Sequence, residues 1–209
     1  MVVKLCHVRG AGPCVDCPVH RREMLTALVS RSPQCGVRLE CVTLEARDEV
    51  PATWFARYAF GIVRRGVLVR ERFDPDQGRT AVDAAGRGAY VPLGLTRGGT
   101  GYAASRVLMC VYPSASLDGL TVQDGLGDLM KLAGETLERV ERIAEARGRT
   151  SAAARVAALH NTLEGCFGAH AFEDLLQRDL AALLGIRTET VCRVLRKRVR
   201  AEEPSDEGA

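Results

Sequence analysis

Long uncharged apolar segments are missing from this sequence of 209 residues. A membrane-spanning helix needs about 18 such residues in succession, and a secretory signal peptide needs an apolar stretch close to the N-terminus. Because the sequence contains neither, we expect a cytoplasmic protein that does not enter the membrane. With 46% hydrophobic and 26% charged residues, the composition is typical of a folded globular chain and excludes a largely disordered one.

Internal repeats and low-complexity tracts are also missing, apart from an acidic tail at residues 201–209, which we expect to be disordered. The net charge of +3 is too small to indicate a partner. Composition and periodicity divide the rest of the chain into a cysteine-rich segment (1–36), a β-rich segment (37–116), a long helix (117–147) and a further helical domain (148–200).

The β-rich segment contains short stretches of alternating apolar and polar residues, separated by turns that contain glycine. This alternation is typical of strands that have one buried face. We therefore predict an antiparallel barrel or jelly roll and, with the helices that follow, a fold of the α+β class. The predicted strands lie at residues 37–44, 55–63, 66–72, 79–85 and 104–112.

The long helix carries apolar residues at alternating spacings of four and three, which is the pattern of a coiled-coil seam. Such a narrow stripe favours pairing with a second copy of the helix, so we predict a homodimer. The alternative is that the stripe packs on the chain's own β-rich segment. A further helix is predicted at residues 152–167. The stripe of the long helix consists of Leu126, Met130, Ala133, Leu137, Val140 and Ala144.

Residues 175–200 hold the most specific pattern in the sequence: a short helix, a turn at Gly185-Ile186, and a second helix with Thr188 as its N-cap. This order predicts a helix-turn-helix. Residues 187–200 contain six arginine or lysine residues and a single acidic residue, which is a balance that attracts DNA phosphates. A plain solvated basic face is the alternative. The residues expected to pack the two helices together are Leu180, Ala181, Leu184, Ile186, Val191 and Leu195.

Residues Gln177 to Leu195, QRDLAALLGIRTETVCRVL, resemble the helix-turn-helix of the CRP/FNR family of bacterial transcription regulators, and the order of segments along the chain is similar to the family's. The resemblance implies a β-roll sensor domain (a cupin-like jelly roll), a dimerisation helix and a DNA-binding domain, with no enzymatic activity. It also implies a homodimer that binds a palindromic site in double-stranded DNA and works with RNA polymerase. The family's β-hairpin wing is not evident here, because the acidic tail follows the helix-turn-helix.

The same resemblance implies roles for individual residues of the second helix. Glu189 and Arg193 are the implied base-reading pair, with Thr190 on a phosphate. This chemistry is reasonable because arginine offers a donor fork to the edge of guanine and glutamate accepts a hydrogen bond from cytosine. The full set of expected DNA contacts is Thr188, Glu189, Thr190, Cys192, Arg193, Arg196 and Lys197.

Eight cysteines are present, which in a reducing compartment indicates metal or redox chemistry rather than a disulfide framework. Cys14 and Cys17 are separated by two residues and Cys6 lies nearby, a grouping that suits zinc or an iron–sulfur cluster. A thioredoxin-like redox pair would need a surrounding βαβ unit, which the sequence does not predict. Cys41 and Cys166 are in phase with apolar neighbours, so we expect them in the core.

Cys110 closes the last predicted strand and is similar in context to the distant fourth ligand of the FNR-like, iron–sulfur members of the family. The resemblance therefore implies a [4Fe–4S] cluster that senses oxygen, nitric oxide or redox state, with Cys6, Cys14, Cys17 and Cys110 as ligands. Several alternatives stay open: Cys35 in place of Cys6, a structural zinc on Cys6, Cys14, Cys17 and His20, a small-molecule effector in the β-roll, or a metal-sensing protein that acts through a protein partner.

Overall fold

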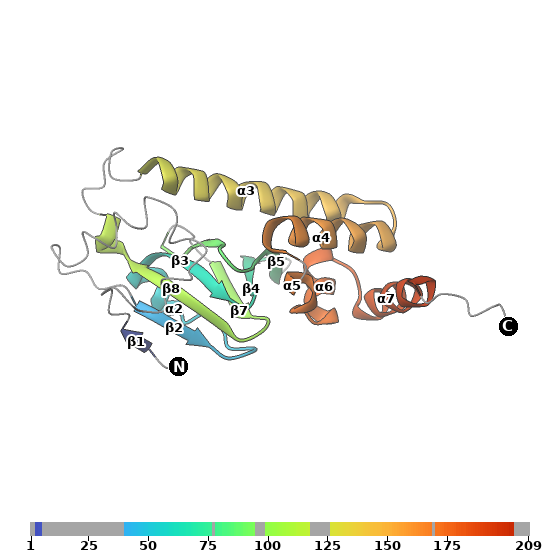
Figure 1. Cartoon of the computed structure of the whole chain (residues 1–209), viewed down its shortest axis with the longest axis horizontal. Helices are drawn as coiled ribbons and strands as arrows, with labels where there is room; N and C mark the ends of the chain where they lie inside the picture. Colours follow the sequence, from blue (N-terminus) through green and yellow to red (C-terminus); the bar gives the residue numbers. More distant parts are fainter. Residues whose placement is uncertain are drawn as a thin grey trace.

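The computed structural model describes residues 3–5, 40–76, 78–94, 99–117, 126–168 and 170–202. Two antiparallel sheets come first in the chain and helices follow them (Figure 1), so the predicted α+β class is confirmed. The longest helix runs along both the sheets and the shorter helices. Among the described residues, no helix is both long enough and apolar enough to cross a membrane.

Each sheet is antiparallel throughout. The larger sheet has the strand order β1-β2-β8-β3-β6, and the smaller sheet has the order β5-β4-β7. The larger sheet contains β1 (Val3–Leu5), β2 (Glu40–Leu44), β3 (Tyr58–Arg65), β6 (Tyr90–Pro92) and β8 (Val107–Pro113), and the smaller contains β4 (Leu68–Asp74), β5 (Gly78–Ala85) and β7 (Gly99–Ala103).

All five predicted strands are present, with shifted ends. The strand predicted at 55–63 starts only at Tyr58, because residues Ala52–Arg57 form helix α2 directly after Pro51. Strands β1, β6 and β7 are not among the predictions. The first two have three residues each, too few to show alternation, and the third, GTGYA, is rich in glycine, which sequence rules assign to turns.

Strand β8 lies at the centre of the larger sheet, and its side chains alternate between two hydrophobic clusters. Met109 and Val111 belong to the core between the two sheets. Tyr112 belongs to a second cluster on the opposite face, and Cys110 packs against that cluster. The larger sheet is therefore covered by apolar groups on both faces near β8.

Helix α3 (Leu126–Gly148) supplies part of that second cluster. Its Leu132 packs with Phe60 and Tyr112, whose rings are stacked at 4.3 Å. Further along the helix, Arg139 donates two hydrogen bonds to Asp83 of β5, at 2.7 and 2.8 Å, and both side chains are almost completely buried. One face of α3 is thus fixed to the sheets. The helix was predicted at 117–147; residues 114–117 instead form a short 3-10 turn (Ser114–Leu117), and residues 118–125 are outside the described chain.

In the described part of the chain, four helices follow α3: α4 (Ala152–Phe167), α5 (His170–Glu173), α6 (Gln177–Leu184) and α7 (Thr188–Glu202). Helix α4 has the predicted ends, and Ser151 caps it by accepting a hydrogen bond from the Ala154 amide at 3.1 Å. The prediction that Cys166 lies in the core is wrong, because its side chain is exposed. The helical period turns Leu163 and Phe167 inward in the last turn and places Cys166 between them at the surface.

A third hydrophobic cluster joins the helices to the smaller sheet. Val69 and Ala84 of the smaller sheet belong to the same cluster as Leu163 of α4, Leu184 of α6 and Val191 of α7. Because buried apolar area stabilises the contact between these elements, the helical part is held in one orientation against the sheets.

Candidate nucleic-acid interface

Helices α6 and α7 are joined by the turn that the sequence predicts. Gly185 ends α6 in the left-handed conformation, with φ of +62°, which glycine adopts without strain. The Ile186 amide then donates to the Ala181 carbonyl at 3.1 Å and closes the turn. The prediction of Thr188 as N-cap is wrong by one residue: Thr188 already lies in α7, and the preceding Arg187 carbonyl accepts from the Thr190 amide at 3.0 Å.

The inner faces of the two helices are buried, as predicted. Leu180 and Leu184 of α6 and Val191 of α7 are at most 2% exposed. Ile186 and Leu195 pack against the same cluster from its edge. The helix-turn-helix is therefore a packed unit, and the rotation of α7 about its own axis is fixed.

The outer face of α7 carries the side chains predicted to contact DNA. Glu189, Arg193, Arg196 and Lys197 are exposed, and within the described part of the chain none of the four forms an ion pair. Thr188, Thr190 and Cys192 are half-buried beside them, and the Cys192 thiol donates to the Gln177 side chain of α6. The arrangement presents three exposed cations on one helix face, ready to meet phosphates or base edges.

A buried carboxylate fixes this unit to the sheets. Asp179 of α6 is 1% exposed and accepts hydrogen bonds from both terminal nitrogens of Arg47, at 2.7 and 2.9 Å. It also accepts from the Tyr102 hydroxyl of β7 at 2.9 Å and from the Leu176 amide at 2.9 Å. One side chain thus caps the first turn of α6 and ties that helix to β7 and to the turn after β2.

The charged form of Asp179 is favoured by this environment. Burial acts to raise the pKa of the carboxyl group, but the hydrogen bonds from Arg47, Tyr102 and the Leu176 amide outweigh burial, so the pKa of Asp179 lies below its ordinary value. The stability that the link contributes is therefore present above pH of about 4 and is lost as the pH falls through the lowered pKa.

Three residues of the apolar stripe of α3, Met130, Leu137 and Ala144, lie on the face that points away from the sheets. Met130 is 65% exposed and Leu137 is 59% exposed, while Ala144 is also exposed and Ala133 and Val140 are half-buried. The alternative in which the whole stripe packs on the chain's own sheets is therefore wrong. The residues that face the sheets are offset from the stripe around the helix; they are Leu132, Thr136, Arg139, Ile143 and Ala146.

Of the four predicted metal ligands, Cys110 alone lies among the described residues. Cys6, Cys14 and Cys17 lie outside the described residues, as do the alternative ligands His20 and Cys35. Cys110 is described, and it lies half-buried in β8 with its Sγ 3.4 Å from the Sγ of Cys41 in β2. Cys41 is buried as predicted. Among the described residues there is no group of three or more side chains suited to hold a metal ion.

Comparisons with solved structures identify the fold of this chain. A scan against protein-family models finds no match, and a search of curated proteins finds none either. Among solved structures, FixK2 from Bradyrhizobium japonicum is 21% identical with a TM-score of 0.63, over 81% of this chain and 88% of that chain. A CRP/FNR family transcriptional regulator from Thermus thermophilus is 18% identical with a TM-score of 0.53, over 78% of this chain and 87% of that chain. The chain has the CRP/FNR fold. A cyclic nucleotide-binding domain containing protein from Listeria monocytogenes, 10% identical, matches with a TM-score of 0.63 over 87% of this chain and 92% of that chain.

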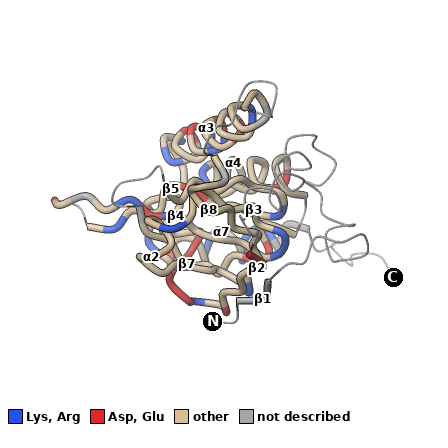
Figure 2. The backbone as a smooth tube through the Cα atoms, turned by 90° about the vertical axis from the view of Figure 1, so that its left-hand side faces the viewer, with Lys and Arg blue, Asp and Glu red and all other residues tan. Residues whose placement is uncertain are grey.

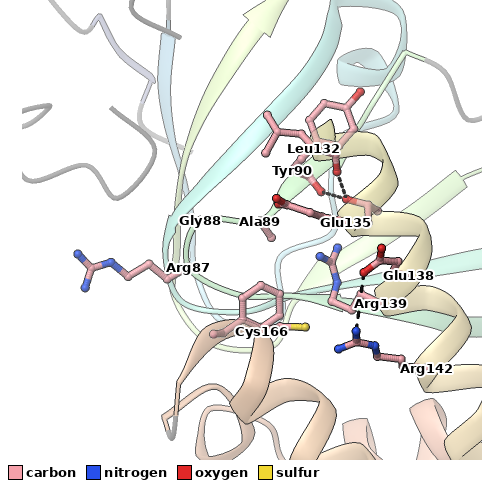
Figure 3. A pocket seen from close by; sticks show the side chains of 12 residues that line it. Arg87, Gly88, Ala89, Tyr90, Leu132, Glu135, Glu138, Arg139, Arg142 and Cys166 are labelled. Atoms are coloured by element: carbon pink, nitrogen blue, oxygen red, sulfur yellow. Dashed lines mark hydrogen bonds and ion pairs between the residues drawn. The ribbon is translucent and has the colours of Figure 1, made fainter. Parts of the chain in front are cut away.

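In this CRP/FNR fold, a cavity of about 380 Å³ lies between α3, the turn after β5 and the end of α4 (Figure 3). The cations around it are already engaged or turned outward. Arg139 is paired with Asp83, Arg142 is 3.7 Å from Glu138, and Figure 3 shows the Arg87 side chain pointing away from the other lining residues. The cavity is therefore polar without offering an unpaired charge to an anionic ligand.

Two features of the CRP/FNR fold in this chain lie beyond what sequence reasoning found. The Asp179–Arg47 link joins residues 132 positions apart, and the Cys41–Cys110 contact joins residues 69 positions apart. The spacing of residues in the sequence predicts local structure only, and it does not predict contacts between residues so far apart. The one local signal was the acidic residue three positions into α6, which suits a helix N-terminus.

Replacing Asp179 with asparagine tests the link between α6 and the sheets. The amide keeps an oxygen for the Leu176 N–H but no charge for Arg47, so we expect the free energy of unfolding at neutral pH to fall by about 3 kcal/mol. Urea denaturation followed by circular dichroism measures it. The difference from wild type should shrink as the pH falls below about 4, because the Asp179 carboxyl group of the unfolded chain is protonated there first and that of the folded protein only at a lower pH.

The exposed Glu49–Arg79 pair, 2.7 Å apart beside the smaller sheet, is the matched control. Arg79→Gln should change stability little, because water screens an exposed ion pair. Equal losses in the two variants, or a difference between wild type and Asp179→Asn that does not change with pH, would contradict the role given to Asp179.

Proposed function

We propose that this chain is a dimeric, non-enzymatic transcription regulator that reads DNA with α7. The observation that carries the proposal is the exposed, basic outer face of α7, on a helix whose inner face is fixed in the core. A helix held in this way can enter the major groove while the fold stays unchanged. Arg193 would offer paired donors to a guanine edge and Glu189 would accept from cytosine, while Lys197, one turn beyond Arg193, would meet the phosphates.

The stripe of α3 supports a homodimer. Two copies of α3 side by side would cover Met130 and Leu137, which a monomer leaves in water. Figure 2 shows α3 at the periphery of the molecule, with acidic and basic residues interspersed along it, as is common beside a coiled-coil seam. A two-fold axis along α3 would place two copies of α7 on one side of DNA, and half-sites would be about 10 bp apart from centre to centre.

Substitutions on the outer face of α7 should separate base reading from phosphate attraction. Arg193→Ala should lower the affinity for a cognate site by about 1–3 kcal/mol and reduce discrimination between sites. Lys197→Ala should weaken binding to all sequences alike and reduce the salt dependence of binding. Fluorescence anisotropy with cognate and scrambled duplexes at several salt concentrations measures both effects. Identical, sequence-independent losses in the two variants would contradict base reading by Arg193.

A charge in the α3 stripe should separate the protomers. Leu137→Glu places a carboxylate where the proposal puts the centre of the seam, so sedimentation velocity should report a monomer with an unchanged circular dichroism spectrum. Lys131→Glu, at an exposed polar position of the same helix, is the matched control and should stay dimeric. A dimer that persists in Leu137→Glu would place the interface elsewhere.

We further propose that the regulator senses oxygen, nitric oxide or redox state through a [4Fe–4S] cluster on Cys6, Cys14, Cys17 and Cys110. The position of Cys110 suits this role, because Cys110 is a half-buried thiol. It packs against the hydrophobic side chains around Leu132 of α3. When bound, such a cluster would supply a redox-active group held by four thiolates. Cys110 would hold one corner of it to β8, close to the packing of α3.

The metal proposal predicts about four iron and four sulfide per chain after anaerobic purification. Cys110→Ala should abolish iron binding, whereas Cys41→Ala, which removes the neighbouring thiol, should leave it intact. Inductively coupled plasma analysis and visible absorption measure the content. One zinc and no iron per chain, retained in Cys110→Ala, would favour the structural zinc on Cys6, Cys14, Cys17 and His20.

A small-molecule effector is the second candidate for the signal. The cavity beside α3 favours it, because Glu135 and Thr136 of α3 and Tyr90 of β6 contribute to one lining. A ligand there would touch both the sheets and α3. An effector would raise DNA affinity in protein that carries no metal, which distinguishes it from the cluster.

A further inference from the structure

Cys41 and Cys110 face each other across two neighbouring strands. They are directly paired in the antiparallel register of β2 and β8, and their Sγ atoms are 3.4 Å apart. Directly opposite residues in such a pair project from the same face of the sheet, with Cα atoms about 4.5–5.5 Å apart. Disulfides span Cα distances of about 4.4–6.8 Å, so the backbone needs no rearrangement to accept one.

The sulfur atoms themselves need only a small movement. A disulfide bond is about 2.05 Å long, so the two sulfur atoms must move closer together. A small rotation of the two side chains is enough for this. Cys41 is 8% exposed, while Cys110 is half-buried and more accessible. A small oxidant would therefore reach Cys110 first, and Cys41 would be the thiol that resolves the product.

We propose that, in protein that carries no cluster on Cys110, Cys41 and Cys110 form a reversible intramolecular disulfide when hydrogen peroxide oxidises them. Peroxide transfers one oxygen to the Cys110 sulfur, which gives a sulfenic acid and one water molecule. The Cys41 sulfur then attacks the Cys110 sulfur, the S–O bond breaks, and a second water leaves as the S–S bond forms. Both thiols are oxidised, one peroxide is reduced to two waters, and a dithiol reductant reverses the reaction.

The position of the pair connects this chemistry to α3. Cys110 packs against the cluster that contains Ile62, its neighbour across β3, and Leu132 of α3. Close-packed interiors transmit small displacements, so turning the Cys110 sulfur toward Cys41 changes the surface on which the first half of α3 rests. Oxidation therefore acts on the helix that carries the exposed stripe. This thiol chemistry does not depend on DNA binding.

Peptide mapping of the full-length protein tests the disulfide. Reduced protein is treated with equimolar hydrogen peroxide, its remaining thiols are alkylated, and it is digested with trypsin and studied by mass spectrometry. We expect peptides 39–47 and 107–131 to be joined, with a mass lower by two hydrogen atoms than the sum of the two thiol peptides. Dithiothreitol should remove the joined species.

Three single variants complete the test. Cys41→Ser and Cys110→Ser should each abolish the joined species, and Cys166→Ser, which removes an exposed cysteine, should leave it unchanged. The proposal is overturned if Cys110 is joined to a different cysteine, or if peroxide converts Cys110 to sulfinic acid without cross-linking. The wild-type map decides the matter even where a variant does not fold. Iron and zinc measured in the same samples keep this result separate from the metal proposal.

Hydrogen exchange tests the connection to α3. In the disulfide form, exchange of the amides at residues 126–133 should differ from the reduced form by at least severalfold. Peroxide-treated Cys41→Ser should show no such change. Equal exchange in both forms of the wild type would overturn the effect on α3.

Discussion

The hydrogen bonds that converge on Asp179 set the geometry on which any action of this molecule depends. This carboxylate is nearly inaccessible to water, yet it is fully engaged by Arg47, Tyr102 and the Leu176 amide. A buried charge is tolerated only with such complete partnering, so the carboxylate specifies one docking of α6 on the sheets. Because α7 is packed on α6, the same interaction fixes where the basic face of α7 points.

Helix α3 has two faces with different tasks. Its inner face is held to the sheets by Leu132 and by the buried Asp83–Arg139 pair, while its outer face leaves Met130 and Leu137 in water. A change in the sheet beneath α3 can thus reach the exposed stripe that we propose as the dimer seam. The Cys41–Cys110 pair lies on the sheet face that contacts α3. The proposed thiol chemistry therefore acts on the same helix that carries the exposed stripe.

Periodic features of the fold could be predicted from the sequence, and non-local ones could not. The helix at 152–167, the turn at Gly185 and the buried set of α6 and α7 follow from apolar spacing and one glycine, which are local signals. Strand β7 was missed because sequence rules assign glycine-rich segments to turns. The exposure of Cys166 was missed because adjacent residues of a helix point in different directions, so a residue next to the buried stripe can lie at the surface.

The candidate interface was predictable for the same reason, since its residues occupy one face of one helix. The thiol pairing was not, because register between β2 and β8 depends on the whole sheet. Cys41 could be recognised as buried from its alternation in phase with Val37 and Leu39, but nothing in the sequence indicates which strand would lie beside it.

The central claim is that two copies of this chain read DNA together through α7. Selection of purified full-length protein against random duplex DNA, followed by sequencing of the bound pool, tests it most directly. The account predicts an enriched two-fold symmetric sequence with half-sites about 10 bp apart from centre to centre. A bound pool with no enriched sequence would contradict it and leave α7 as a basic surface without base recognition.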